Sequence, residues 1–296
     1  MFIDQSILQH ETAVEPMIRR QPRHGPAART ALTLLGGLAV TLILLFLILP
    51  TLIIIPMSLS TTSHLQFPPQ GLTWMWYAAY FSDPDWMAAT WFSLRIAIAT
   101  SLTATTVGTL AALAIVRGDV PFKGMLHALS MGPLVVPHIV LGVALYLVLS
   151  PLQLTGTLAG FLIGHTVLAV PFVVITVMAA LQRLDPALDL AALNCGANRA
   201  QAFIHVTLPN IAPSLASGAV FSFLASFDEA TVAFFISDVG GKSIGRKMFE
   251  DIDFNLTPVI AAASTVVVFA SLFLIGFAQL LLKAENPQIQ TEEYDQ

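Results

Sequence analysis

Six long runs of apolar residues alternate with shorter polar segments along the chain. Each run is long enough to cross a bilayer, since about 20 helical residues span a hydrocarbon layer of roughly 30 Å. The runs lie at residues 31–55, 89–116, 125–150, 157–181, 212–236 and 258–282. Prolines inside the third and fourth runs do not exclude spans, because neighbouring helices can satisfy the backbone groups that proline frees. The pattern predicts an all-α, six-helix membrane domain over 31–283, with tails at 1–30 and 284–296.

The composition agrees with a membrane protein. The chain is 56% hydrophobic and 10% charged, with a mean hydropathy of +0.78, whereas soluble domains carry roughly 25% charged residues. Because residues 1–30 are polar and basic and the run after them is long, we expect no cleavable signal peptide. Cys195 is the only cysteine, so no intramolecular disulfide can form, and we interpret it as a small buried residue. No Cys/His spacing is typical of a metal site, and we expect no nucleic-acid partner.

Lysine and arginine are distributed unevenly between the two sides of the predicted helices. One side carries nine: Arg19, Arg20, Arg23, Arg29, Arg117, Lys123, Arg183, Arg199 and Lys283. The other side carries three: Lys242, Arg246 and Lys247. Since cytoplasmic segments are enriched in these residues, we predict that both termini and the 182–211 loop face the cytoplasm. On the outer side, we interpret the rings of residues 56–88 as an interfacial aromatic belt: Trp74, Trp76, Tyr77, Tyr80 and Trp86.

The 182–211 loop reads as two short helices. Asp185 before Pro186 is a typical N-cap followed by proline at the first helical position, and Gly196 suits a left-handed C-terminal residue. Asn198 can cap a second helix, which we expect to end at Leu208–Pro209. Such a compact pair of helices can dock into a groove of another protein. It can equally be a linker packed against its own membrane domain.

The same loop resembles a known signature. It reads Leu190-Ala191-Ala192, three residues, Gly196, nine residues, then Val206-Thr207-Leu208-Pro209. Bacterial ABC importer permeases of type I carry Glu-Ala-Ala, three residues, Gly, nine residues and Ile-x-Leu-Pro before their fifth span. Leu190 and Val206 depart from that pattern. The resemblance implies a coupling helix that seats in an ATP-binding subunit, with contacts from Leu190, Ala191, Ala192, Gly196, Ala197, Phe203, Leu208 and Pro209.

Three further segments, 93–117, 226–237 and 247–268, are similar to the branch of that family that carries spermidine and putrescine. The resemblance implies a multi-pass, non-catalytic permease subunit in the bacterial inner membrane that moves a small organic cation, foremost a polyamine. Another amine, an opine or an amino acid remains an alternative. The implied partners are two ATP-binding subunits that bind ATP and magnesium, a homologous or identical second permease, a periplasmic binding protein and membrane lipid. The chain itself is expected to hold no cofactor.

Two adjacent carboxylates, Asp228 and Glu229, fall inside the fifth apolar run. Ionisable residues at membrane depth usually face a cavity or a partner, so one of them could line the translocation path and attract a cationic amine. Alternatively, they pair with Arg95 in the second run, or the span ends before them. His138 and His165 also lie in predicted spans and could contact substrate, although hydrogen bonding to a neighbouring helix is the commoner role for such histidines.

Other function classes find little support. The segment 240–243, Gly-Gly-Lys-Ser, lacks the earlier glycine of a phosphate-binding loop, because Ile236 stands at that position. No nucleophile–base or metal constellation lies in the spans, which argues against a membrane enzyme. A secondary transporter could use Asp228 and Glu229 as ion ligands, but it predicts inverted repeats, and we find no internal symmetry.

Overall fold

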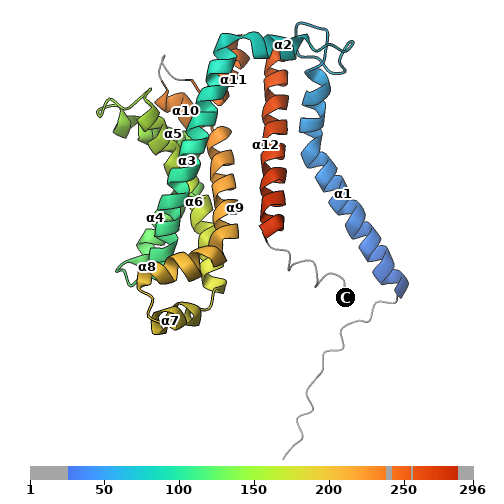
Figure 1. Cartoon of the computed structure of the whole chain (residues 1–296). Helices are drawn as coiled ribbons and strands as arrows, with labels where there is room; N and C mark the ends of the chain where they lie inside the picture. The colour runs from blue at the N-terminus through green and yellow to red at the C-terminus, as the bar shows by residue number, and fades with distance from the viewer. Residues whose placement is uncertain (1–25, 238–241, 255, 286–296) are drawn as a thin grey trace, which may run out of the picture. The chain divides into compact units, whose positions relative to one another are not determined.

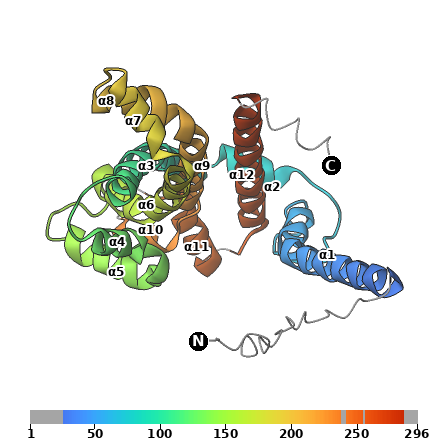
Figure 2. The same cartoon turned by 90° about the horizontal axis from the view of Figure 1, so that it is seen from below.

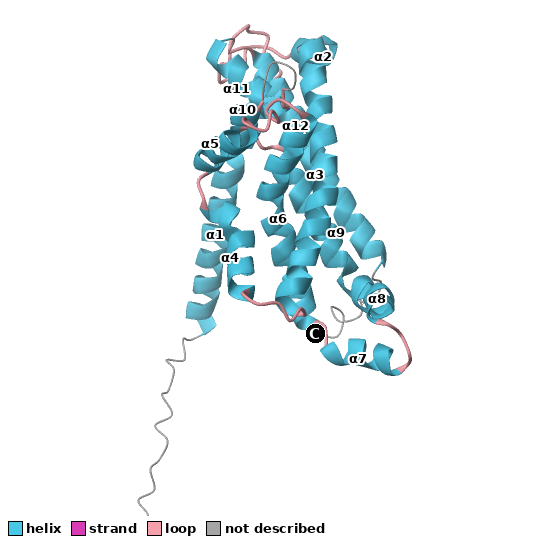
Figure 3. Ribbon diagram, turned by 90° about the vertical axis from the view of Figure 1, so that its left-hand side faces the viewer, coloured by secondary structure: helices cyan, strands magenta, loops and turns pink. Residues whose placement is uncertain are grey.

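The computed structural model describes residues 26–237, 242–254 and 256–285, and every regular element in these ranges is helical (Figures 1 and 3). The elements are α1 (Pro26–Met57), α2 (Met75–Ser82), α3 (Pro84–Val116), α4 (Lys123–Val135), α5 (His138–Leu149), α6 (Leu158–Arg183), α7 (Pro186–Asn194), α8 (Arg199–Ala202), the π-helix η2 (Phe203–Thr207), α9 (Leu208–Phe227), α10 (Thr231–Ile236), α11 (Ile244–Phe254) and α12 (Pro258–Glu285). Most of both predicted tails, together with Gly240 and Gly241, lies outside the described residues.

The chain divides into two compact units, Met1–Leu52 and Ile53–Gln296. The first contains most of the described part of α1, a continuous apolar helix. The second contains the remaining helices. Five described helical segments are long and apolar enough to cross a membrane: Thr33–Ser58, Pro84–Val116, Leu158–Arg183, Arg199–Phe227 and Pro258–Phe277. The bent pair α4 and α5 makes a sixth if it forms one span.

The third predicted span, 125–150, is not one straight helix. Its two halves, α4 and α5, are bent by 112°. The residue before a proline is driven from helical to extended backbone, and Val136 before Pro137 is extended at φ −75° and ψ 129°. Pro133 and Pro171, in contrast, lie inside α4 and α6. Pro137 therefore divides the run into two helices, while the expectation that prolines do not exclude a span here stays open, since the bent pair can still form one.

The fifth predicted span, 212–236, is also displaced. Helix α9 begins at Leu208, directly after α8 and η2, and ends at Phe227. Asp228 and Glu229 lie in the break that follows, before the short helix α10. The prediction that both carboxylates lie within a helical span is wrong, and the alternative, that the helix ends before them, is correct.

Helices α3, α6 and α9 pack together along the core of the second unit (Figure 2). Buried side chains from all three helices form one apolar cluster: Ala104, Ala112, Ala169, Val173, Val177, Leu181 and Ile211. Close approach depends on small residues at the contacts. A Cβ at Gly108 would lie 2.7 Å from Val173 Cβ, and one at Gly218 would lie 2.7 Å from Thr176 Oγ1. The three helices therefore form a tightly interlocked core.

At the end of the unit that contains α2 and α11, aromatic residues have mixed roles. Tyr80 and Trp86 are buried in a cluster with Ile244 and Ile260. Trp76 donates from Nε1 to the carbonyl of Ser60 at 2.7 Å, whereas Trp74 is 73% exposed. The interpretation of these rings as an interfacial belt is therefore wrong for Tyr80 and Trp86, which are core residues.

The three cations that the charge count assigns to the outer side lie in α11 or just before it, and each is ion-paired. Lys242 and Arg246 bind Glu250 at 2.8 and 2.9 Å, and Lys247 binds Asp251 at 2.9 Å. Burial alone would raise the pKa of Glu250, but the hydrogen bonds and charges of its two partners outweigh that effect and hold the pKa below its ordinary value. The cytoplasmic orientation of the other end stays a prediction.

Candidate functional site

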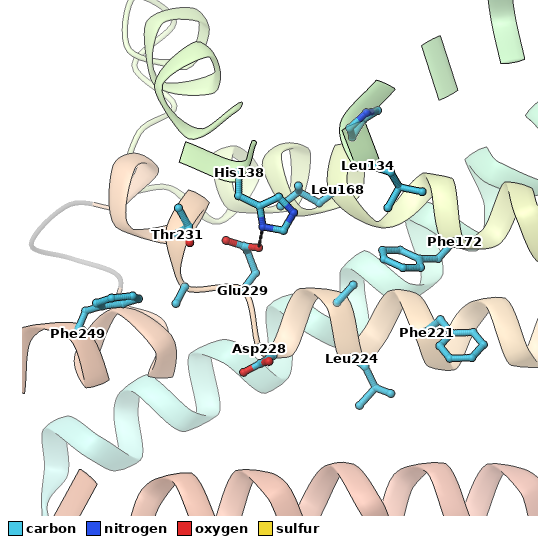
Figure 4. Close-up of a pocket in the computed structure, with 13 residues that line it drawn as sticks. Leu134, His138, Leu168, Phe172, Phe221, Leu224, Asp228, Glu229, Thr231 and Phe249 are labelled. Atoms are coloured by element: carbon cyan, nitrogen blue, oxygen red, sulfur yellow. Dashed lines mark ion pairs between the residues drawn. The ribbon is translucent and has the colours of Figure 1, made fainter. Parts of the chain in front are cut away.

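A cavity of about 580 Å³ lies where the two broken helix pairs, α4–α5 and α9–α10, meet (Figure 4). Its walls are mostly apolar and include Leu134, Leu168, Phe172, Phe221, Leu224 and Phe249. The polar side chains on its lining are His138, Asp228, Glu229 and Thr231. A few polar groups in an apolar cavity of this size are typical of small-molecule sites.

Glu229 is fully engaged in structural contacts. Its side chain is only 6% exposed. Oε1 accepts a hydrogen bond of 2.7 Å from the backbone N–H of Val232, in the first turn of α10. Oε2 lies 3.2 Å from Nδ1 of His138, the first residue of α5, as the dashed line in Figure 4 shows. Glu229 therefore stabilises α10 and joins the two helix breaks to each other.

Asp228 is different. It is exposed, and its side chain forms no ion pair or hydrogen bond within the described part of the chain. It stands at the C-cap of α9, where the helix dipole disfavours an anion. The residue lines both the main cavity and an adjoining hollow of about 320 Å³ between α9 and α12. Asp228 is thus an unpaired carboxylate that faces open space.

The remaining intramembrane polar residues do not join these carboxylates. Arg95 is exposed on α3 and forms no ion pair with Asp228 or Glu229 in the described residues. The alternative that pairs them is therefore not observed. His165 is buried, and its Nδ1 hydrogen-bonds Ser226 Oγ at 2.8 Å between α6 and α9. His165 thus takes the helix-bonding role that is common for such residues, whereas His138 lines the cavity.

The second candidate region is the loop that resembles the coupling signature. Asp185 caps α7 by accepting from the N–H of Ala187 at 2.9 Å, and Gly196 adopts a positive φ of 92°. Asn198 and Gln201 form a reciprocal capping box at α8. The structure confirms all three local predictions for this loop. They were predictable because a cap depends only on neighbouring residues.

The expected end of the second loop helix at Leu208–Pro209 is wrong. The helix continues through the π-turn η2 into α9, and the N–H of Leu208 bonds the carbonyl of Phe203, five residues earlier. A proline inside an α-helix removes a hydrogen bond and clashes with the carbonyl four residues earlier. The wider π-turn directly before Pro209 changes that register, and the proline then occupies the first turn of α9.

The exposed face of α7 in this loop is mainly apolar. Leu190 is 60% exposed and Ala191 is exposed. Gly196 and Pro209 are exposed as well, and Ala192, Ala197, Phe203 and Leu208 are half-buried. Cys195 is exposed, so its interpretation as a buried residue is wrong. These positions are placed on one loop, and their contacts with a partner stay a prediction.

Residues 104–289 match the family of binding-protein-dependent transport system inner membrane components. Because this match covers more than half of the chain, the protein belongs to that family: it is a permease component of an ABC importer in the bacterial inner membrane, not an enzyme subunit.

Curated relatives carry more specific names. The spermidine/putrescine transport system permease protein PotC of Haemophilus influenzae is 30% identical over 224 residues, which cover 73% of this chain and 84% of the relative. The putrescine transport system permease protein PotI of Escherichia coli K12 is 29% identical over 83% of this chain and 90% of the relative. The sulfate transport system permease protein CysT of the same strain is 28% identical over 69% and 79%.

Solved structures confirm the type I permease fold. The methionine transporter MetNI, in an inward-facing conformation, matches with a TM-score of 0.57 and 18% identity over 69% of this chain and 99% of the matched chain. A bacterial alginate ABC transporter, solved in complex with an alginate pentasaccharide-bound periplasmic protein, matches with a TM-score of 0.67 and 17% identity over 89% and 96%. At these identities the likeness shows the fold alone.

Sequence reasoning missed two features of the cavity. It discounted His138, which the fold places against Glu229 although the two are far apart along the chain. It also gave no role to Phe172 and Phe221, which line the cavity from α6 and α9. The one available signal for His138 was its position directly after Pro137, where the helix breaks and side chains become accessible.

Proposed function

We propose that this permease component translocates a polyamine, putrescine or spermidine, and that Asp228 binds an ammonium group of the substrate in the cavity. The observation that most directly supports this proposal is the unpaired carboxylate of Asp228 at the C-terminal end of α9. The partial negative charge of that helix end adds to the charge of the carboxylate. A cation placed there would be attracted by both.

The chemistry of the cavity fits a polyamine better than an anion. Polyamines combine ammonium groups with methylene chains, which match a free carboxylate within mostly apolar walls. Phe172 and Phe221 can add attraction between a cation and an aromatic face. The relatives named for polyamines and for sulfate have nearly equal identity to this chain, so the overall identity alone does not distinguish a cation from an anion. A free carboxylate on the path disfavours sulfate.

Uptake by the reconstituted complex tests this assignment. Asp228→Asn should lower putrescine uptake at limiting substrate by roughly tenfold to a hundredfold, the range for losing a hydrogen bond to a charged group. Asp253→Asn, the same change at an exposed residue of α11, is the matched control and should leave uptake unchanged. If Asp228→Asn and Glu229→Gln both transport at the normal rate in an intact complex, the carboxylates are not on the path.

We further infer the assembly that such a permease requires: a second permease chain, two ATP-binding subunits that dock on the α7–α8 loops, and a periplasmic substrate-binding protein. The apolar, exposed face of α7 supports docking into a groove of another protein rather than packing against its own helices. Membership in a binding-protein-dependent family favours this ATP-driven assembly over a self-sufficient secondary transporter.

Copurification tests the assembly. The ATP-binding subunit encoded with this chain should copurify with it, and removal of residues 186–206 should abolish both the association and substrate-stimulated ATP hydrolysis. Retention of both after this deletion would contradict the coupling role of the loop.

A further inference from the structure

Four helix ends meet at one carboxylate, Asp189, in the first turn of α7. Arg117, at the C-cap of α3, donates from a guanidinium nitrogen to Asp189 Oδ2 at 2.5 Å. A second guanidinium nitrogen of Arg117 donates to the carbonyl of Leu184, at the C-cap of α6, at 3.0 Å. Thr207, the last residue of η2, donates to Asp189 Oδ1 at 2.7 Å. We call these four residues the Asp189 junction.

The junction is half-buried and lies against the core. The side chains of Arg117 and Asp189 are 21% and 25% exposed, and Thr207 is buried. Leu184 belongs to the apolar cluster that α3, α6 and α9 form. Both oxygens of Asp189 are occupied, so the contacts fix the rotation of α7 about its axis as well as its position.

Helix α7 has few other connections to the bundle. Its two covalent links are the extended residues Leu184 and Asp185, and the turn at Gly196. Within the described residues, the side chains of α7 form hydrogen bonds to other helices only through Asp189. Figure 3 shows α7 beyond the ends of the bundle helices, so few of its residues can pack on them. Within the described residues, the junction is therefore the main polar cross-link between α7 and the ends of α3, α6 and η2.

We propose that Asp189 is a positioning residue for energy coupling: with Arg117 and Thr207 it holds α7 rigidly to the ends of α3, α6 and α9. A displacement of α7 by a docked ATP-binding subunit then moves all three helices together instead of bending the short links. This proposal rests on the proposed coupling role of the loop. It also accounts for the exposure of Leu190. Asp189 points toward Arg117 and Thr207, whereas Leu190, about 100° away around the helix, can face the ATP-binding subunit.

The experiment uses the complete complex in proteoliposomes and measures substrate uptake per ATP hydrolysed, with copurification of the ATP-binding subunit in parallel. Asp189→Asn and Arg117→Gln should each lower uptake per ATP by about tenfold, within the range of coupling energies for contacting charged residues. Thr207→Val, which keeps the ion pair, should have a smaller effect. The exchanged pair Asp189→Arg with Arg117→Asp should recover much of the lost coupling.

Arg183→Gln is the matched control, since this exposed arginine is the last residue of α6, close to the junction, and forms no ion pair with a described residue. It should couple normally. Unchanged uptake per ATP in both single variants, or no recovery in the exchanged pair, overturns the positioning role. So does loss of copurification in Asp189→Asn, because the residue would then be a docking contact. If the unaltered chain fails to bind the ATP-binding subunit, the proposed function itself fails, which is a separate outcome.

Discussion

The break after α9 and the start of α7 each contain an adjacent pair of residues with opposite roles. At the break, Glu229 is buried and bonded to Val232 and His138, while Asp228 is exposed and unpaired. In α7, Asp189 is bonded to Arg117 and Thr207, while Leu190 is exposed. In both regions one residue holds the structure and its neighbour is left free.

The difference lies in the chemistry of the free residue. Asp228 offers a negative charge to a cavity, which suits a cationic solute. Leu190 offers apolar surface outside the bundle, which suits a groove of another protein. In α7, a bonded residue and an exposed one can occupy consecutive positions because neighbouring residues on a helix project about 100° apart; Asp228 and Glu229 lie in a break between helices, where the local backbone sets their directions. Under the proposed function, Asp228 would contact the substrate at the C-terminal end of α9, and Leu190 would contact the partner protein near its N-terminal end.

The largest expected effect distinguishes Glu229 from Asp228, the adjacent residues in the break after α9. Glu229→Ala removes the cap of α10 and the contact with His138, and should lower the free energy of unfolding by about 1–3 kcal/mol, because it leaves the buried N–H of Val232 without a partner. Asp228→Ala should change it by less than about 0.5 kcal/mol while abolishing most uptake. Thermal melting in detergent, with uptake measured on the same samples, checks both. If Glu229→Ala and Asp228→Ala lower the melting temperature equally, the two residues do not have different structural roles.

The core between the two regions should tolerate little change. Gly108→Ala places a Cβ 2.7 Å from Val173 Cβ on α6, and should lower stability by about 1–3 kcal/mol through overpacking. Gly132→Ala, in α4, meets no atom within 4 Å and should be neutral or slightly stabilising, since alanine favours helix. Melting of the two variants tests whether the three core helices behave as one interlocked body. A neutral Gly108→Ala would argue that they separate easily.

The apolar docking face can be tested by restoring the carboxylate that the family signature carries. Leu190→Glu should weaken association with the native ATP-binding subunit by about tenfold, since burying a leucine contributes about 1.5–3 kcal/mol. Leu188→Glu introduces the same charge about 200° away around α7 and should have less effect. Binding is measured by titrating the ATP-binding subunit onto the permease in nanodiscs. Tighter binding of Leu190→Glu would show that the partner offers a cation there.

The smallest expected effect is on stability and concerns Glu250 of α11, which is ion-paired, in contrast to the unpaired Asp228. The pKa of Glu250 is lowered from its ordinary 4.5 in the folded chain, so its ion pairs stabilise the fold above that pH, and the contribution is lost as pH falls through the lowered value. Glu250→Gln should therefore be less stable than the unaltered chain at neutral pH, by roughly 0.5–1 kcal/mol. The two melting curves should converge in acid. A difference that persists at the lowest pH would contradict the pairing.

Local sequence explains which parts of the candidate sites were predictable. The caps at Asp185, Gly196 and Asn198 involve residues within three positions of each other, so the short helices of the loop followed from the sequence. The end of α9 at Phe227 has no proline or glycine to mark it. It depends on Glu229 capping α10 and on contacts between α10 and α5, which only the folded chain brings together.

The sequence by itself determined an all-helical membrane protein with a two-helix loop, because apolar run length and short-range capping are properties of contiguous residues. The permease family was indicated only by the resemblance of that loop to a known signature. The tertiary structure decided which member of each adjacent pair is bonded and which is free. Glu229 meets His138, and Asp189 meets Arg117 and Thr207, only after helices distant in the chain have packed. With the oxygens of Glu229 and Asp189 bonded in this way, the neighbouring residues remain free: Asp228 faces the cavity and Leu190 faces outward.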